Sequence, residues 1–152
     1  MARTRLLALA LFWTGAAAAQ DASLDPLSSC PQPPRDSTPT IRWEPMRTGD
    51  MLFCRAVLAD SGEEAFALTI SRESPFRPRR GDRAEVSNVG GREIQWYRGE
   101  VPNDPALQVR ETLLQLSGDR VAHVFMRSRD PEALARYQQL VLSLPLPIRI
   151  ED

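Results

Sequence analysis

The sequence contains no lysine and a single histidine, His123, and its only cysteines are Cys30 and Cys54. Its 19 basic residues, all arginine, are nearly balanced by 20 acidic residues, which leaves a net charge of -1. A charge this close to zero provides no whole-molecule field for nucleic acid, so we expect no nucleic-acid partner. One histidine and two cysteines would need several carboxylates in register to bind zinc, so we predict no metal site and no cofactor.

Long apolar runs are also scarce. Only residues 6–12 form one, and it is too short to cross a bilayer as a stable helix, so we do not expect an integral membrane protein. This run follows Arg3 and Arg5 and precedes the small residues Ala17–Ala19, which is the pattern of a signal peptide cleaved after Ala19. Residues 1–19 therefore predict export to the periplasm or out of the cell.

The two cysteines fit an oxidising compartment. An even pair in an exported protein predicts a disulfide between Cys30 and Cys54, closing a loop of about 25 residues. We interpret this disulfide as structural, because no Cys-x-x-Cys motif is present. An alternative for Cys30 is that residues 27–30 form the cleavage and lipidation site of a bacterial lipoprotein.

Alternating residues predict strands over 51–58, 65–71, 83–89, 92–98, 107–116 and 120–127, with 41–44 as a short candidate ended by Pro45. Turn signals at 60–63, 90–91 and 118–119 predict three hairpins. We predict an α+β fold, with a mainly antiparallel sheet of about six strands and a C-terminal amphipathic helix on one face. Residues 20–40 are expected to form a Pro-rich arm and residues 41–152 a single domain.

The predicted helix begins after Asp130, a good N-cap, with Pro131 in its first turn, and ends before Pro145. Its apolar residues recur at helical spacing on one face: Leu134, Tyr137, Val141 and Leu144. Together with the strand at 121–127 (Val-Ala-His-Val-Phe-Met-Arg), this closing helix resembles the end of PsbP/Mog1-like domains. The resemblance covers about residues 41–144 and implies a small α-β-α sandwich in an exported accessory protein, without a catalytic motif.

His123 lies in an apolar run, 121–126, that predicts a central strand. One interpretation is a buried, hydrogen-bonded core histidine, and the other is a general base. Exposure beside a carboxylate or hydroxyl would favour the second, whereas burial under the helix would exclude it. No nucleophile elbow or phosphate-binding loop accompanies His123, so we predict no catalytic residue.

Two surface features are candidate partner-binding sites. The first is the loop 75–83, whose prolines limit its freedom and whose candidate residues are Phe76, Arg77, Arg79, Arg80 and Arg83. It suits an acidic protein patch, a phosphate-bearing lipid or a polyanion, and the alternative is a solubilising loop. The second is the pair Trp96–Tyr97, of which alternation places one side chain in the core and the other outside.

These features support a non-enzymatic exported binding or accessory protein that contacts a protein in a bacterial envelope, with an immunity or inhibitor protein as a special case. We expect it to be a monomer. The alternative is a small hydrolase or lipid-binding enzyme that uses His123 with carboxylates on adjacent strands. A third class, an assembly subunit, predicts a large exposed apolar patch.

Overall fold

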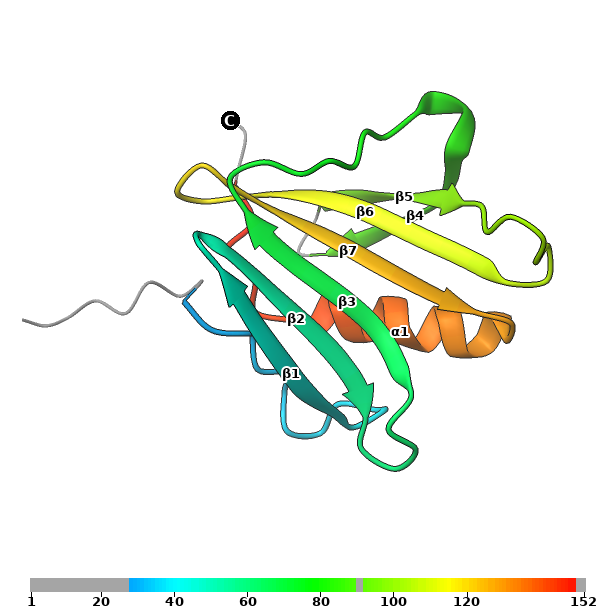
Figure 1. Cartoon of the computed structure of the whole chain (residues 1–152), viewed down its shortest axis with the longest axis horizontal. Helices are drawn as coiled ribbons and strands as arrows, with labels where there is room; N and C mark the ends of the chain where they lie inside the picture. The colour runs from blue at the N-terminus through cyan, green and yellow to red at the C-terminus, as the bar shows by residue number, and fades with distance from the viewer. Residues whose placement is uncertain (1–27, 90–91, 150–152) are drawn as a thin grey trace, which may run out of the picture.

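The structure is a computed structural model that describes residues 28–89 and 92–149. Within these ranges one antiparallel sheet is followed by one α-helix (Figure 1). The elements are β1 (Ile41–Thr48), β2 (Met51–Leu58), β3 (Glu64–Ser71), the 3-10 turn η1 (Arg80–Asp82), β4 (Arg83–Val89), β5 (Arg92–Gly99), β6 (Gln108–Leu116), β7 (Arg120–Ser128) and α1 (Pro131–Ser143). The predicted α+β class is confirmed, with seven strands in place of about six.

The predicted hairpins form where short turns tolerate positive φ. Gly118 and Asp119, with φ of 71° and 53°, lie in the three-residue connection between Leu116 of β6 and Arg120 of β7. Val89 pairs directly with Arg92, so a two-residue connection joins β4 to β5. The predicted glycines of that turn, 90–91, lie outside the described residues.

Strand β1 is longer than predicted, because Pro45 does not end it. The strand continues to Thr48, which pairs with Met51 across a turn that contains Gly49 at φ 59°. Strand β1 lies at the edge of the sheet and pairs only with β2, and an edge strand tolerates a residue without an N–H on its outer side. The β1–β2 hairpin was therefore not predicted.

Two meanders, β1–β3 and β4–β7, make up the sheet in the order β1-β2-β3-β7-β6-β5-β4. They join where β3 pairs with β7, with Thr69 opposite His123. Strand β7 is thus the central strand, as its apolar sequence predicted. Because β4 lies at the far edge, the segment 72–82 must cross the sheet from β3 to reach it (Figure 1).

Helix α1 covers one face of the sheet. Its N-cap is Asp130, whose Oδ1 accepts a hydrogen bond from the backbone N–H of Glu132 at 2.9 Å, and Pro131 follows as predicted. The helix buries one stripe against the sheet: Ala133, Leu134, Tyr137, Gln138, Leu140 and Val141. The strands contribute the other half of the core through their alternate residues: Leu52, Cys54, Ala56, Phe66, Leu68, Ile70, Ile94, Trp96, Leu114, Leu116, Ala122, Val124 and Met126.

The described part of the N-terminal arm packs on the β1–β2 end of the same core. The disulfide between Cys30 and Cys54 is present, and both residues belong to the core. A second contact between the arm and the sheet is a hydrogen bond, in which the indole N–H of Trp43 donates to the carbonyl of Pro31 at 2.9 Å. Since the sulfur of Cys30 is bonded to Cys54, it cannot also carry a lipid. The predicted signal peptide, residues 1–19, lies outside the described residues.

A polar cluster joins β4, β6 and α1 beside the core. Glu85 accepts hydrogen bonds from Arg110 Nε at 2.8 Å and from the buried amide of Gln138. Partial burial by itself raises the pKa of Glu85, but the hydrogen bonds from Gln138 and Arg110 outweigh it and hold that pKa below its ordinary value of 4.5. The ionised carboxylate therefore helps to hold the β4 edge strand to the helix.

We expect this cluster to make folding sensitive to acid. Because the pKa of Glu85 is lower in the folded than in the unfolded chain, its contribution is fully present above about pH 4.5. That contribution is lost as the pH falls through the lowered pKa. Urea unfolding midpoints at pH 7 and pH 3.5 should differ less for Glu85→Gln than for the native chain. The effect should be small, because the Glu85 side chain is 41% exposed. Glu100→Gln, an exposed carboxylate after β5 that takes no part in the cluster's hydrogen bonds, is the control, and an equal change in both variants would contradict the assignment.

Candidate functional site on the open face of the sheet

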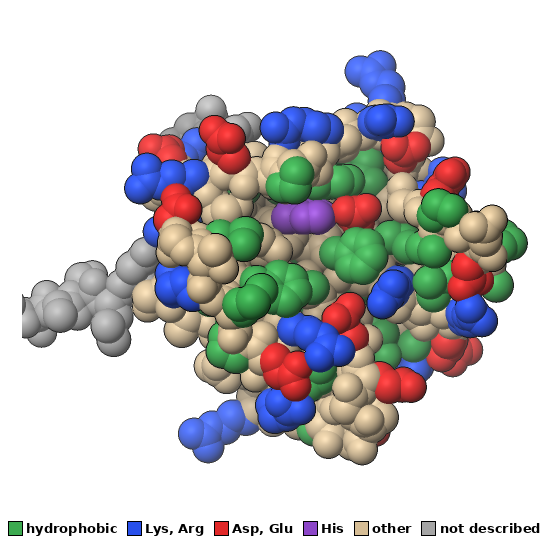
Figure 2. All heavy atoms as spheres, in the orientation of Figure 1, with side chains coloured by type: hydrophobic (Ala, Val, Ile, Leu, Met, Phe, Trp, Pro, Cys, Tyr) green, Lys and Arg blue, Asp and Glu red, His purple; other side chains and the backbone are tan. Residues whose placement is uncertain are grey.

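The sheet face opposite α1, here called the open face, has no helix over it in the described residues. Strand pairing arranges its side chains in two neighbouring rows. One row runs across Met46, Phe53, Thr69, His123 and Leu113, and the other across Arg55, Ala67, Phe125, Glu111 and Tyr97. Figure 2 shows this face, with the single histidine among hydrophobic side chains and an acidic one beside it.

Much of the open face is apolar and accessible. Phe53, Leu113 and Phe125 are half-buried, although they lie on the central strands β2, β6 and β7. The described residues include two large hydrophobic side chains that are exposed, Met46 at 57% and Val86 at 53%. Met46 pairs with Phe53 and Val86 pairs with Gln95, so both belong to the open face. An apolar area of this kind on a folded domain is typical of a binding surface.

The segment 72–82 crosses this face and covers part of it with one aromatic side chain. The ring of Phe76 stacks on the imidazole of His123, with centroids 4.9 Å apart and planes 8° from parallel. Its edge also contacts Tyr97 on β5, at 5.9 Å between centroids. The structure thus brings the predicted candidates Phe76 and Tyr97 together. Phe76 lies on His123, which was not predicted to contact either residue.

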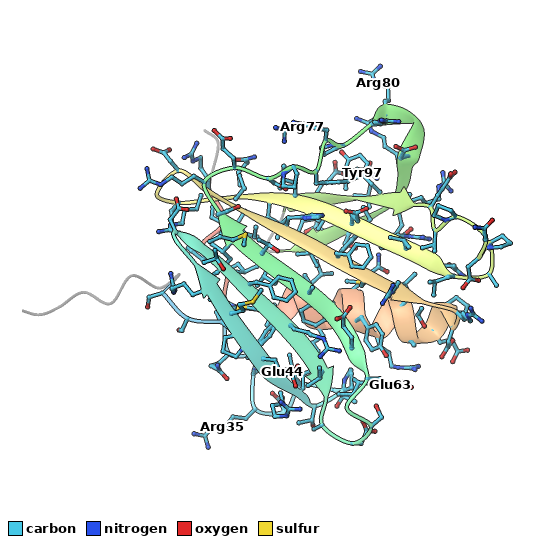
Figure 3. The ribbon with its side chains drawn as sticks, viewed as in Figure 1. Arg35, Glu44, Glu63, Arg77, Arg80 and Tyr97 are labelled. Carbon is cyan, nitrogen blue, oxygen red and sulfur yellow. A yellow bond between two sulfur atoms is a disulfide. The ribbon has the colours of Figure 1, made fainter. Side chains whose placement is uncertain are left out.

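Four arginines of the loop 75–83, Arg77, Arg79, Arg80 and Arg83, form a positive rim beside the aromatic group. Arg77 donates to the carbonyls of Ser74 and Phe76 within its own loop, which holds the loop in shape. Arg79, Arg80 and Arg83 are exposed. In Figure 3 the side chains of Arg77 and Arg80 stand above the sheet, on the side of the labelled Tyr97. All four arginines predicted as partner-binding candidates therefore lie at one edge of the open face.

Trp96 does not belong to this site. Its side chain has no exposed surface and lies on the helix face of β5, where its indole N–H donates to Ser87 Oγ at 3.0 Å. Neighbouring strand residues point to opposite faces, which places Tyr97 on the open face instead. Trp96 is therefore a core residue, and Tyr97 alone of the pair can contact a partner.

Beneath Phe76, His123 and Glu111 form a close pair. His123 Nε2 lies 2.7 Å from Glu111 Oε2, and each side chain is 18% exposed. His123 is thus on the open face and not under the helix, and a carboxylate lies within hydrogen-bond reach. The sequence did not predict Glu111 as the partner of His123. The turn signal at 118–119 could not have found it: Leu116 pairs with Arg120 across three residues, and only this register, with Leu113 opposite His123, places Glu111 diagonally across from His123.

Two further properties of the described ranges bear on function. No group of three or more His, Cys, Asp or Glu side chains in them is arranged to hold a metal ion. Neither does any helix there have the length and hydropathy to span a bilayer.

The resemblance to PsbP/Mog1-like domains stays a prediction. Comparison of the chain with family models, with curated proteins and with solved structures finds no match.

Proposed function

We propose that this protein is an exported, non-enzymatic binding protein of a bacterial envelope, which contacts a protein partner through the open face of its sheet. The observation that carries the proposal is the accessible apolar surface on the face away from α1. If only the helix face of the sheet had a role, we would expect the open face to carry polar side chains, or its apolar side chains to be buried.

Charge favours an acidic partner. The apolar rows are bordered by the arginine rim, and its members Arg79, Arg80 and Arg83 are exposed. A border of one charge sign steers a partner of the opposite sign and sets its orientation, while the apolar centre provides most of the affinity. A protein patch that combines acidic residues with apolar ones has the matching chemistry.

Export is supported by two separate features. Residues 1–19 have the order of a signal peptide, with arginines, a short apolar run and small residues. The disulfide between Cys30 and Cys54 is the kind of bond that persists in an oxidising compartment. Mass spectrometry of the protein from native cells should find a chain that starts at Gln20 and contains no free thiol.

The binding face can be tested by site-specific crosslinking in native cells. A photo-crosslinking amino acid at Phe125, on the open face, should capture a partner, whereas the same group at the exposed Gln139 on α1 should not. Arg79→Glu/Arg80→Glu should reduce the yield at position 125 by about tenfold, because it reverses the charge of the rim. Equal capture from both positions, or none from position 125, would contradict the proposal.

A second candidate function, hydrolysis, is favoured by the contact between His123 and Glu111. A carboxylate can orient an imidazole as a general base, and the hydroxyl-bearing Thr69 lies opposite His123 in the strand register. If this were the function, His123→Gln should lower turnover of a simple ester such as p-nitrophenyl acetate by at least about 100-fold. A binding protein should show the same background rate with either residue.

A further inference from the structure

The segment 72–82 crosses the open face with one side chain anchored on the sheet. Phe76 is half-buried, whereas the other residues of 75–81 are all exposed. The hydrogen bonds that the structure shows for 75–81 stay within the segment, such as that from the Phe76 N–H to Ser74 Oγ. None of these described residues shares a hydrogen bond with a strand. The position of the segment on the sheet therefore depends mainly on the Phe76 ring.

His123 provides the surface on which this ring lies. The Phe76 ring and the imidazole are 8° from parallel, with centroids 4.9 Å apart. Stacking in this arrangement requires the imidazole to keep one orientation. The torsion that turns an imidazole about its Cβ–Cγ bond has broad minima, so a histidine without a hydrogen-bond partner would leave the ring free to turn.

Glu111 supplies the partner that fixes this orientation. A carboxylate accepts hydrogen bonds, and Glu111 Oε2 lies 2.7 Å from His123 Nε2. The N–H bond of an imidazole lies in the plane of its ring, so an acceptor held on the neighbouring strand β6 sets the direction of that plane. Both side chains are only 18% exposed, which limits the competition from water for this bond.

We propose that Glu111 and His123 are positioning residues for partner binding. Glu111 fixes the imidazole, the imidazole holds Phe76, and Phe76 holds the positive rim beside the apolar rows of the open face. The rim is thus presented in one arrangement before a partner arrives, which reduces the conformational entropy lost on binding. This inference rests on the proposed function, because the arrangement of the rim matters only if a partner binds there.

Limited proteolysis tests the hold on the segment without any partner. Trypsin should cleave after the exposed Arg79 or Arg80 only when the segment leaves the sheet and extends into the protease. His123→Ala should speed this cleavage about tenfold, because the stacking surface is lost. Phe76→Ala, which alters no strand residue, should have the same effect. The control is Phe53→Ala, which removes an aromatic ring from the open face two strands away from His123 and should keep the native rate.

Glu111 should act through His123. Glu111→Ala should speed the same cleavage about threefold, because the hydrogen bond that orients the imidazole is lost. Glu111→Gln should keep the native rate, since its amide oxygen can still accept from His123 Nε2. In a chain that already carries His123→Ala, adding Glu111→Ala should change the rate no further. An additional increase in that double variant would show that Glu111 affects the segment by another route, and the positioning role would be wrong.

Partner capture shows whether this positioning matters for binding. With the photo-crosslinking amino acid at position 125, Glu111→Ala should lower the yield about threefold, and Glu111→Gln should restore it. Faster cleavage with unchanged capture would overturn the positioning role and leave the proposed binding face intact. Native cleavage rates in both His123→Ala and Phe76→Ala would also overturn it, because other contacts would then hold the segment. No capture from position 125 in the native chain would instead contradict the proposed function, and this inference with it.

Discussion

Trp96→Ala is expected to lower the free energy of unfolding by about 3–5 kcal/mol, the largest effect of any substitution considered for this protein. The indole is fully buried between β5 and the helix layer. Its removal leaves a cavity and also deprives Ser87 Oγ of its 3.0 Å hydrogen bond. Because β5 pairs with β6 over only three residues, the β4–β5 hairpin depends strongly on side-chain packing, to which Trp96 contributes the largest fully buried side chain. Urea unfolding followed by far-UV circular dichroism measures the loss.

The adjacent residue provides the matched control. Tyr97→Ala should cost about 1 kcal/mol or less, since Tyr97 is only half-buried and lies on the open face. It should instead reduce partner capture at position 125, because it removes the edge contact that supports Phe76. Equal loss of stability in the two variants would show that the assignment of the two residues to opposite faces is wrong.

Reduction of the disulfide is expected to cost about 3.5 kcal/mol of unfolding free energy, the second large effect. The bond closes a loop with a sequence separation of 24, and most of its stabilisation comes from the entropy that this closure removes from the unfolded chain. Unfolding midpoints in the presence and absence of a phosphine reductant measure the loss. In the reduced protein the arm should also separate from β1, which exposes the Trp43 indole that is bonded to Pro31.

The control for effects of the reductant itself is a variant without the disulfide. Cys30→Ala/Cys54→Ala should be about as unstable as the reduced native chain, and its midpoint should not change when reductant is added. If the reduced native chain kept its full stability, the arm would be held by its other contacts, such as the bond from Trp43 to Pro31. The entropic account of this loop would then fail.

Turn residues, capping residues and apolar periodicity predicted most of the strands and the helix, because each of these features acts over a few neighbouring residues. Turns such as 118–119 need residues that accept positive φ, and those residues stand out in the sequence. Helix α1 begins at a cap and a proline whose effects act within one turn. The predicted end of β1 at Pro45 was wrong, because whether a proline interrupts a strand depends on the strand's position in the sheet.

The candidate site was predicted only in pieces. The sequence indicated the arginine-rich loop with Phe76, and Tyr97, as separate features. It indicated His123 as an isolated residue with two interpretations. Their assembly depends on the pairing of β3 with β7, which carries the segment 72–82 across the sheet. That pairing joins residues about fifty positions apart, and no short-range pattern encodes it.

The amino-acid sequence by itself therefore determined three of the hairpins, the helix, the disulfide partners and the α+β class, because each depends on turn chemistry, periodicity or composition over a short stretch of chain. Tertiary structure alone decided the strand order, the burial of Trp96, the pairing of Glu111 with His123 and the short pairing of β5 with β6. These depend on which apolar surfaces bury one another across the whole sheet, and that choice is made by the free energy of the complete fold.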